Sequence, residues 1–368
     1  MKVIVSAGGT GGHIYPALAI INKLKEVDPK LEVLYIGTHN RMEKDIVPEK
    51  GIPFETLEIY GLYRKKVYKN IKTFTCFYKS YRKCLRIMKK FQPDLVIGVG
   101  GYVTAPVILA AHKLKIKTAI HEQNSVPGAS NRFLSKYVDK IMVSFPASKK
   151  EFPEGKTVYT GNPCSEDALK TTSIQKSEYG LNDKKKLVTI VMGSLGASHV
   201  NQFLVDSMSY FENKDYEVAF VTGKQDYEEV ITHTFPNNIH VYPYVPLTSF
   251  MKKTDLLVSR AGASTLSEIM ALHVPCILIP SPYVPNNHQW KNAMGLVQEK
   301  AAILLEEKDL KGDVLVKTID QLLDNPIQLE MMEKQLKKLS VSDSATRIVE
   351  ELYKLVDGDS YGNDKDVR

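Results

Sequence analysis

Near its start, the chain reads Val3-Ile4-Val5-Ser6-Ala7-Gly8-Gly9-Thr10-Gly11-Gly12-His13. The first five residues form a short, mostly apolar run that is typical of a buried strand, and four of the next five are glycine. Proline is favoured in the first turn of a helix, so we expect a helix to begin near Pro16. Glycines let the backbone approach a ligand closely, and a helix start offers unpaired N–H groups to an anion. The stretch therefore predicts an α/β fold that opens with a diphosphate-binding turn.

This turn has two alternative interpretations. A dinucleotide site requires the pattern G-x-G-x-x-G, but position 14 is Ile, and the second predicted strand ends at Ile36-Gly37-Thr38 without the acid that would hold a ribose. A purely structural turn is the other alternative, although it would not require so many glycines.

Strands and helices alternate along the rest of the chain, which predicts parallel sheets with crossover helices. Gly161-Asn162-Pro163 interrupts this pattern before a polar segment at 166–186, and a second series then opens with Leu187–Met192 and Gly193-Ser194-Leu195-Gly196. We expect strands at 31–36, 54–59, 95–99, 117–120, 141–144, 158–160, 218–221, 239–241, 256–259 and 276–279, a long helix at 69–90, and helices between 310 and 355.

The predicted fold class is α/β, with two Rossmann-like domains facing across a cleft. A chain of 368 residues exceeds what one hydrophobic core usually supports, so two domains are expected. We assign the N-terminal domain to 1–162, the C-terminal domain to 163–343, a final helix to 344–356 and a polar tail to 357–368.

Composition excludes several protein classes. Hydrophobic residues make up 43% of the chain and charged residues 25%, which are ordinary values for a globular protein. The four cysteines form no C-x-x-C pair and are too few for a disulfide framework, which favours a reducing compartment. The N-terminal apolar run is too short for a signal peptide, and no window approaches the roughly 18 apolar residues of a spanning helix. We therefore expect a cytoplasmic protein whose membrane contact is peripheral.

Residues 59–93, here called the basic segment, contain no Asp or Glu. They contain eleven Lys or Arg residues interleaved with eight Tyr or Phe residues, within a chain whose net charge is +7. This composition suits an anionic membrane surface, at about 1 kcal/mol for each cation near the headgroups. Nucleic acid and a solvated helix face are the alternatives. We expect an anionic membrane surface to be the partner of this segment, and we expect no nucleic acid.

Several polar residues of the first half follow predicted strands. His13 lies at the mouth of the glycine turn and is a candidate general base, because its reference pKa is near 6.5; a structural role is the alternative. Gly98-Val99-Gly100-Gly101-Tyr102 forms a second glycine turn, and two such turns at neighbouring strand ends would make a wider anion site. Asn124 could hydrogen-bond a sugar or cap the helix that follows.

The second half shows a comparable pattern. Gly262 and Ser264 would start a helix after the strand at 256–259, with Glu268 one turn later. A helix start suits a diphosphate and a nearby carboxylate suits ribose hydroxyls, whereas a capping Ser-Thr pair with a solvated Glu is the alternative. Asn286-Asn287-His288-Gln289 offers amides that suit sugar hydroxyls. There is no H-E-x-x-H, no G-x-S-x-G and no Cys/His cluster, and the D-x-D motifs lie in the polar tail, so we expect no metal and no cofactor.

Taken together, the motifs resemble those of the MurG family of glycosyltransferases. They run in order across most of the chain, and the ordered set is specific although each motif alone is weak. The matching stretches are Gly8–His13 with Pro16, Gly98–Tyr102, His121–Asn124, Gly161–Pro163, Gly193–Ala197, Gly262–Glu268 and His288-Gln289 with Asn292-Ala293.

The resemblance implies a GT-B fold whose last helix crosses back to the first domain. It implies transfer of N-acetylglucosamine (GlcNAc), with inversion, from UDP-GlcNAc to the C4 hydroxyl of MurNAc in undecaprenyl-diphospho-MurNAc-pentapeptide (lipid I). The product would be lipid II, a precursor of peptidoglycan, made at the cytoplasmic face of the cell membrane. The N-terminal domain would bind acceptor and membrane, and the C-terminal domain the UDP-sugar.

By the same resemblance, individual residues take specific roles. Ser194 and the helix start at 263–265 would contact the diphosphate, Glu268 the ribose, Gln289 the GlcNAc hydroxyls, and Val245 or Tyr244 the uracil through backbone atoms. Many family members carry an Arg just after Gly-Asn-Pro, where this chain has Cys164-Ser165, so Arg260 or another residue would have to replace it. The candidate donor-binding residues are Thr10, Gly11, Gly12, Asn124, Ser165, Ser194, Val245, Ala263, Ser264, Thr265, Glu268 and Gln289, and the candidate residues for the acceptor diphosphate are Gly9, Gly100, Gly101 and Tyr102.

Two other function classes stay open from the sequence. UDP-GlcNAc 2-epimerases share the two-domain plan but need no membrane-binding surface, so the basic segment argues against them. A non-enzymatic anion-binding module would not need two facing sites.

Overall fold

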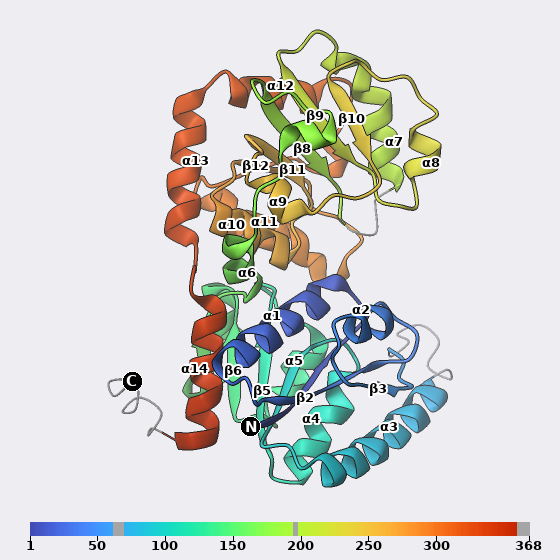
Figure 1. Cartoon of the computed structure of the whole chain (residues 1–368), viewed down its shortest axis with the longest axis vertical. Helices are drawn as coiled ribbons and strands as arrows, with labels where there is room; N and C mark the ends of the chain where they lie inside the picture. Colours follow the sequence, from blue (N-terminus) through green and yellow to red (C-terminus); the bar gives the residue numbers. More distant parts are fainter. Residues whose placement is uncertain (62–69, 194–197, 359–368) are drawn as a thin grey trace. The chain divides into compact units, whose positions relative to one another are not determined.

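The computed structural model describes residues 1–61, 70–193 and 198–358, which fold into two compact units (Figure 1). Unit 1 comprises Met1–Cys164 together with the C-terminal residues from Asp343 onward, and unit 2 comprises Ser165–Ser342. Three predicted features lie outside the described residues: Ser194, the cations Arg64–Lys69 and the polar tail beyond Gly358.

Unit 1 is built on a seven-stranded sheet with the order β3-β2-β1-β4-β5-β6-β7, and every neighbouring pair is parallel. The central strands of the sheet are nearly continuous apolar or glycine runs because helices cover both faces of the sheet. The strands of unit 1 are β1 (Lys2–Ala7), β2 (Glu32–Thr38), β3 (Phe54–Leu57), β4 (Leu95–Gly100), β5 (Lys117–Glu122), β6 (Lys140–Val143) and β7 (Thr157–Tyr159).

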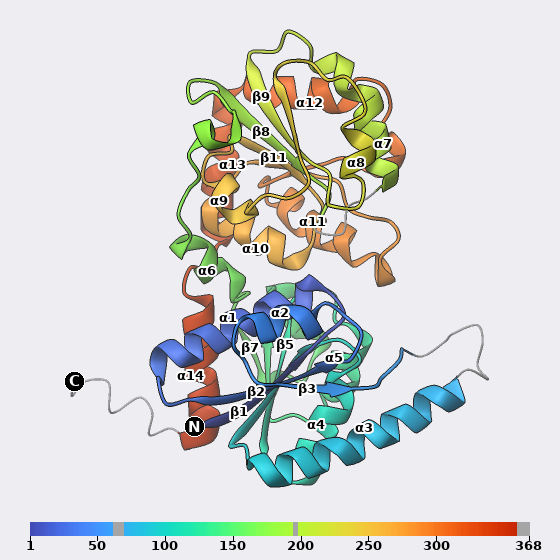
Figure 2. The same ribbon diagram turned by 45° about the vertical axis from the view of Figure 1, so that its right-hand side comes forward.

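Two sets of helices cover the faces of this sheet. On one face, α1 (Gly11–Val27) and α14 (Ser344–Asp357) pack over Val3 and Val5 of β1. On the other face, α3 (Asn70–Phe91) and α4 (Thr104–Lys113) pack over Ile4, with α3 lying along α4 (Figure 2). The short helices are α2 (Glu43–Glu49) and α5 (Ala129–Leu134).

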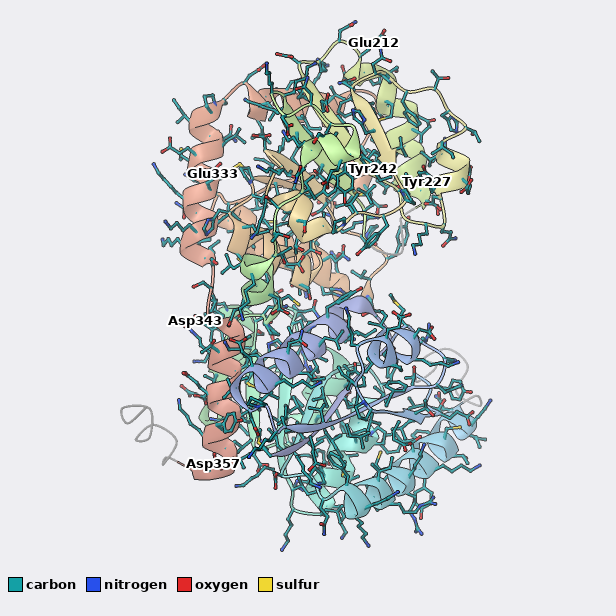
Figure 3. The ribbon with its side chains drawn as sticks, in the orientation of Figure 1. Glu212, Tyr227, Tyr242, Glu333, Asp343 and Asp357 are labelled. Atoms are coloured by element: carbon teal, nitrogen blue, oxygen red, sulfur yellow. The ribbon has the colours of Figure 1, made fainter. Side chains whose placement is uncertain are left out.

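Helix α14 brings the end of the chain back to unit 1. Asp343 and Asp357 mark its two ends in Figure 3. The Ser344 hydroxyl donates to the Asn162 carbonyl oxygen at 2.6 Å, and Lys140 of β6 pairs with Glu351 at 2.9 Å. The two places where the chain passes between the units are therefore joined by a hydrogen bond within unit 1.

The predicted start of the first helix was wrong. Helix α1 begins at Gly11 with Thr10 as its N-cap, so Pro16 lies in the second turn and not the first. Glycine has a poor intrinsic helix propensity, which hides the first turn from a sequence pattern. As a result, the N–H groups at the helix start belong to the glycine turn itself.

Unit 2 has a six-stranded parallel sheet with the order β10-β9-β8-β11-β12-β13. Its strands are β8 (Lys186–Val191), β9 (Tyr216–Val221), β10 (Ile239–Tyr242), β11 (Leu256–Ser259), β12 (Cys276–Leu278) and β13 (Ile303–Leu304). The two-residue strand β13 was not predicted because so short a run carries no recognisable period. The helices are α6 (Cys164–Lys170), α7 (Ser198–Ser207), α8 (Tyr227–Val230), α9 (Leu247–Met251), α10 (Ala263–Leu272), α11 (His288–Gln298), α12 (Val314–Leu323) and α13 (Pro326–Leu339).

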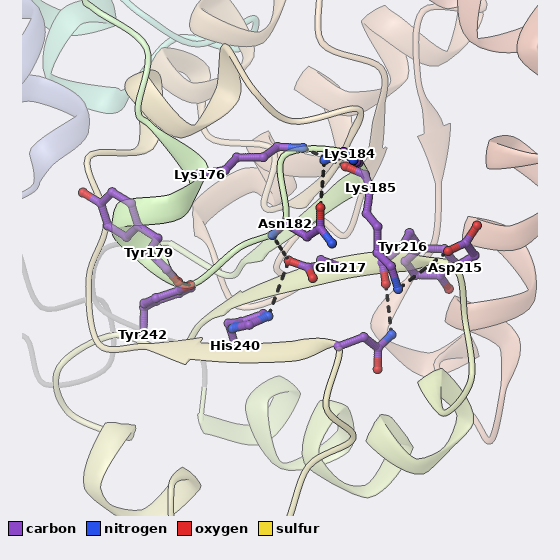
Figure 4. Close-up of polar contacts among 11 residues, drawn as sticks. Lys176, Tyr179, Asn182, Lys184, Lys185, Asp215, Tyr216, Glu217, His240 and Tyr242 are labelled. Carbon is purple, nitrogen blue, oxygen red and sulfur yellow. Dashed lines mark hydrogen bonds and ion pairs between the residues drawn. The ribbon is translucent and has the colours of Figure 1, made fainter.

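A polar network ties the segment before β8 to the outer strands of this sheet (Figure 4). The Asn182 N–H donates to the Glu217 carboxylate at 2.7 Å, and His240 of β10 lies 3.5 Å from that carboxylate. The Tyr242 hydroxyl donates to the Tyr179 carbonyl oxygen at 2.6 Å. Because edge strands expose unpaired backbone groups, these contacts help to cover the β10 edge.

In both sheets, the strand order reverses beside the first strand, so that later strands lie on the opposite side of it. In unit 1 that point lies between β1 and β4, and in unit 2 between β8 and β11. Ligands of such sheets bind beyond the carboxyl ends of the strands at this switch point. The prediction of two parallel-sheet α/β domains is confirmed, and the topology directs attention to the turns after β1, β4 and β11.

Candidate functional site

The two glycine turns of unit 1 lie directly against each other. The Gly8 N–H donates to the Gly100 carbonyl oxygen at 3.2 Å. Gly100 has φ +117°, and a Cβ atom there would lie 2.5 Å from Cδ2 of His13. A Cβ on Gly101 would lie 2.4 Å from the Gly8 carbonyl oxygen. Only glycine fits at these positions, and the close approach brings the turns after β1 and β4 into one surface.

His13 is oriented by this turn. Its Nδ1 atom lies 3.2 Å from the Gly8 carbonyl oxygen. A carbonyl oxygen can only accept, so Nδ1 carries the hydrogen and the neutral imidazole has its lone pair on Nε2. This is the tautomer that a general base acting through Nε2 requires.

Glu43 lies beneath the same turn and is fully buried. Its Oε2 accepts from the Gly9 N–H at 3.2 Å, and its Oε1 accepts from the Thr38 N–H at 2.9 Å and the Thr38 hydroxyl at 2.7 Å. The Gly9 N–H, which we expected to face the acceptor diphosphate, is thus already bonded to a carboxylate. Thr10, at the N-cap of α1, and Tyr102, 61% exposed, lie at the surface of the same region.

Asn124 is held by a second buried carboxylate. Glu122 Oε1 accepts from the Asn124 N–H at 3.0 Å and from its side-chain Nδ2 at 3.2 Å. Glu122 Oε2 accepts from the Gly128 N–H and from Asn131 Nδ2. Because Gly128 is the N-cap of α5, the alternative that Asn124 caps this helix is wrong. Glu122 thus fixes the position of Asn124 just beyond the end of β5.

His121, beside Glu122, has a structural role. It is fully buried; its Nε2 donates to the Gly161 carbonyl oxygen, and its Nδ1 accepts from Gln123 Nε2. Burial lowers the pKa of His121 to about 4, against a weaker opposing effect of the Gly161 carbonyl. The imidazole therefore stays neutral at physiological pH and fixes the end of β5 from which Asn124 projects.

In unit 2, the predicted helix start is confirmed as α10, with Gly262 as its N-cap and Ala263, Ser264 and Thr265 in the first turn. No side chain caps it. The Ser264 hydroxyl oxygen is buried and has no hydrogen-bond partner among the described residues. A buried hydroxyl is normally paired, so this atom fits a group that a ligand would supply.

Glu268 follows one turn later, at the i+4 position from Ser264. Its side chain is half-buried. Burial, with a smaller contribution from the Asp167 carboxylate, raises the pKa of Glu268 to about 8. A carboxyl group with a strongly shifted pKa next to an uncapped helix start is a feature of functional sites.

Helix α11 packs beside α10 and brings Gln289 to the same end of the sheet. Gln289 Oε1 accepts from the Ser281 N–H at 2.8 Å. The Nε2 amide group of Gln289 is then the group that can donate a hydrogen bond to a sugar hydroxyl. Asn292, one turn later, donates to the Ala261 carbonyl oxygen just before α10. Val245 is buried after β10 and its neighbour Tyr244 is 65% exposed; Ser165 is buried in α6.

Arg260 does not match the suggested replacement for the family Arg. Its guanidinium forms an ion pair with Glu307 and donates to the Ile279 carbonyl oxygen, and both partners of the ion pair are largely buried. Breaking a buried pair leaves an uncompensated charge, so this side chain is committed to the structure. Within the described residues, no group of three or more His, Cys, Asp or Glu side chains is placed to hold a metal ion.

Sequence reasoning missed the two buried carboxylates, Glu43 and Glu122. Glu122 stood inside the quoted run His121–Asn124, and its position at the end of a strand was the only signal in the sequence. Glu43 is an acid in a first helical turn, which is common on protein surfaces and gave no reason to single it out.

Comparison with known proteins identifies the family of this chain. Residues 3–143 match the glycosyltransferase family 28 N-terminal domain, and residues 187–348 match the glycosyltransferase family 28 C-terminal domain. A UDP-N-acetylglucosamine--N-acetylmuramyl-(pentapeptide) pyrophosphoryl-undecaprenol N-acetylglucosamine transferase from Bacillus cereus is 46% identical over 97% of this chain and 100% of the relative.

Solved structures agree as well. The crystal structure of Acinetobacter baumannii MurG has a TM-score of 0.77 at 27% identity, covering 96% of this chain and 99% of that one. A UDP-GlcNAc 2-epimerase from Neisseria meningitidis has a TM-score of 0.68 at 17% identity, covering 96% of this chain and all of that one, which shows a shared fold only. The chain belongs to the MurG family of glycosyltransferases.

Proposed function

We propose that this protein transfers GlcNAc from UDP-GlcNAc to lipid I and so forms lipid II. The observation that carries this function is the full-length similarity, at 46% identity, to a transferase named for this reaction. The same fold in an epimerase is only 17% identical, so the epimerase alternative has far weaker support. The test is UDP release from UDP-GlcNAc with and without a lipid I analogue; release that ignores the analogue would contradict the transferase function.

The donor half of the reaction is assigned to unit 2. The start of α10 supplies N–H groups and a positive dipole for the diphosphate, and the Ser264 hydroxyl in its first turn has no partner among the described residues. Glu268 would accept from ribose hydroxyls, and Gln289 Nε2 would donate to GlcNAc. As the anomeric C–O bond to UDP breaks, negative charge grows on the diphosphate, and the helix start stabilises it.

The acceptor half is assigned to unit 1. The acceptor C4 hydroxyl attacks the anomeric carbon from the face opposite UDP, which forms the new glycosidic bond with inversion. His13 Nε2 takes the hydroxyl proton and later releases it to solvent. The orientation of His13 Nδ1 toward the Gly8 carbonyl supports this assignment, because it leaves the lone pair on Nε2.

Membrane docking is assigned to the exposed face of α3. Ile71, Phe74 and Tyr78 are 73%, 63% and 59% exposed, and their spacing places them on one side of the helix. The same spacing continues into Arg82, Arg86 and Lys89, which are also exposed. The opposite side, with Cys84 and Met88, is buried in unit 1. Among the described residues, no helix is both long and apolar enough to span a bilayer.

This face combines an apolar end with a cationic end, as in helices that lie in the interface of an anionic leaflet. Three cations near the headgroups would contribute about 3 kcal/mol before entropy losses. Vesicle sedimentation tests the assignment with two variants, Arg82→Glu/Arg86→Glu/Lys89→Glu and Ile71→Ser/Phe74→Ser. Both should bind anionic vesicles more weakly and still use a soluble acceptor analogue, and binding of wild type should weaken as salt rises. Equal binding of all three proteins would contradict the assignment, and binding of RNA in place of vesicles would favour the nucleic-acid alternative.

A further inference from the structure

One peptide group links Glu43 to His13. The Gly9 N–H donates to Glu43 Oε2 at 3.2 Å, and the carbonyl oxygen of the same peptide group, that of Gly8, accepts from His13 Nδ1 at 3.2 Å. The carboxylate, the peptide and the imidazole therefore form one continuous chain of hydrogen bonds. Its far end is the Nε2 lone pair that the proposed function uses.

Glu43 accepts three hydrogen bonds in this arrangement. Each of its two oxygens accepts from a backbone N–H, that of Gly9 or that of Thr38, and Oε1 also accepts from the Thr38 hydroxyl at 2.7 Å. Glu43 is fully buried at the start of α2, and a Cβ atom on Gly8 would lie 2.4 Å from its Oε1. The carboxylate is thus held against the glycine turn by close packing as well as by hydrogen bonds.

We propose that Glu43 is a positioning residue that acts on His13 through the Gly8–Gly9 peptide, in a relay of carboxylate, peptide and imidazole. Hydrogen bonds in a chain polarise one another in a low-dielectric interior. The carboxylate makes the Gly8 carbonyl a stronger acceptor, which fixes the Nδ1–H tautomer and stabilises the imidazolium that forms when Nε2 takes a proton. The inference rests on the proposed role of His13 as the base.

Other groups around the relay do not replace Glu43. Tyr35 of β2 faces it, and burial, with a smaller effect of the Glu43 charge, raises the pKa of Tyr35 well above its usual value. Its hydroxyl, which donates to the Ala7 carbonyl oxygen, therefore stays neutral. Lys44 and Asp45 of α2 are exposed, and Tyr102 lies on the turn that packs against the imidazole.

The decisive variant is Glu43→Gln, with Glu49→Gln as its matched control because Glu49 is an exposed acid on the same helix. We expect Glu43→Gln to lower kcat by about 10- to 100-fold with little change in the KM of the donor. The acid limb of its kcat–pH profile should move to lower pH by about half a unit to one unit, because the imidazole loses a stabilising charge. Glu49→Gln should match wild type in both measurements.

A second measurement does not depend on catalysis. In ¹⁵N-histidine NMR, the His13 signal is the one of nine that disappears in His13→Ala. In wild type it should show the Nδ1–H tautomer, and its titration midpoint should fall in Glu43→Gln while the melting temperature shows a folded protein. An unmoved midpoint in folded Glu43→Gln would overturn the relay. An Nε2–H tautomer in wild type would also overturn it, and this measurement holds even if Glu43→Gln does not fold. If His13→Ala keeps kcat within tenfold of wild type while the midpoint still moves, the relay stands and the base assignment fails.

Discussion

The turn after β1 in unit 1 and the helix start after β11 in unit 2 occupy equivalent positions in two similar sheets. Their polar groups nevertheless differ in the partners that they find within the protein. In unit 1, Gly8, Gly9 and His13 bond to one another or to Glu43. In unit 2, the Ser264 hydroxyl has no partner among the described residues, and Glu268 has a pKa raised to about 8. The polar groups of the first site already form hydrogen bonds within the protein, whereas the second site contains polar groups that a bound donor would satisfy.

His13→Ala gives the largest expected effect. Loss of a general base lowers kcat by about 10²–10⁴-fold, and the acid limb of the pH profile should disappear with it. The measurement is steady-state kinetics across pH with a soluble acceptor analogue. A loss of less than tenfold with an unshifted profile would reduce His13 to acceptor binding or structure.

Gly100→Ala tests how rigidly the first site is built. The new Cβ would clash with the His13 ring at 2.5 Å, and φ +117° disfavours any side chain. We expect a loss of about 1–3 kcal/mol in the free energy of unfolding and a fall in kcat toward that of His13→Ala. Gly51→Ala is the control, because its φ is also positive but a Cβ there would meet nothing within 4 Å. If Gly100→Ala lost no more stability and activity than Gly51→Ala, the packed turn would not be essential.

How far the sequence could predict these sites depends on where the decisive atoms lie. The glycine turns, the start of α10 and the positions of most strands follow from short local patterns, because glycine, strand and helix signals span only a few residues. The bonds of Glu43 to Gly9 and Thr38 depend on packing between α2, β1 and β2, which no local pattern records. The ion pair of Arg260 with Glu307 likewise joins residues that are far apart in the chain, so the sequence left Arg260 open as a nucleotide contact.

Glu268→Gln tests the opposite character of the second site. The KM of the donor should rise by about ten- to a hundred-fold, because a charge-assisted hydrogen bond to ribose is lost. In wild type, donor affinity should increase as pH rises toward 8, since the carboxyl group must ionise to accept fully; the variant should lose this dependence.

Although Glu268→Gln should weaken donor binding, it should stabilise the folded protein above pH 7. The folded-state pKa of Glu268 lies above its unfolded value, so the unfolded chain releases this proton first and wild-type stability falls as pH rises from about 4.5 to 8. Above pH 7 the variant should melt at a higher temperature than wild type, and near pH 4 the two should melt together. A variant that is less stable than wild type at pH 8 would contradict the expectation that the ionised Glu268 carboxylate destabilises the folded protein.

Ser264→Ala gives the smallest expected effect and separates ligand binding from helix capping. A capping hydroxyl would stabilise the start of α10, so its removal would lower stability by about 1 kcal/mol. Within the part of the chain that the structure describes, no side chain caps α10 and the buried hydroxyl has no partner, so its removal should instead raise the free energy of unfolding by up to about 1 kcal/mol. The donor KM should rise only a few-fold, because the backbone N–H groups of the helix start remain.

Ser267→Ala is the control on the same helix and should not change the donor KM. The Ser267 hydroxyl donates to the carbonyl oxygen of Ala263, four residues earlier, at 2.9 Å. Urea unfolding with and without UDP decides between the two roles: the stability added by UDP should shrink in Ser264→Ala and not in Ser267→Ala. An equal gain from UDP in both variants would remove Ser264 from the donor site.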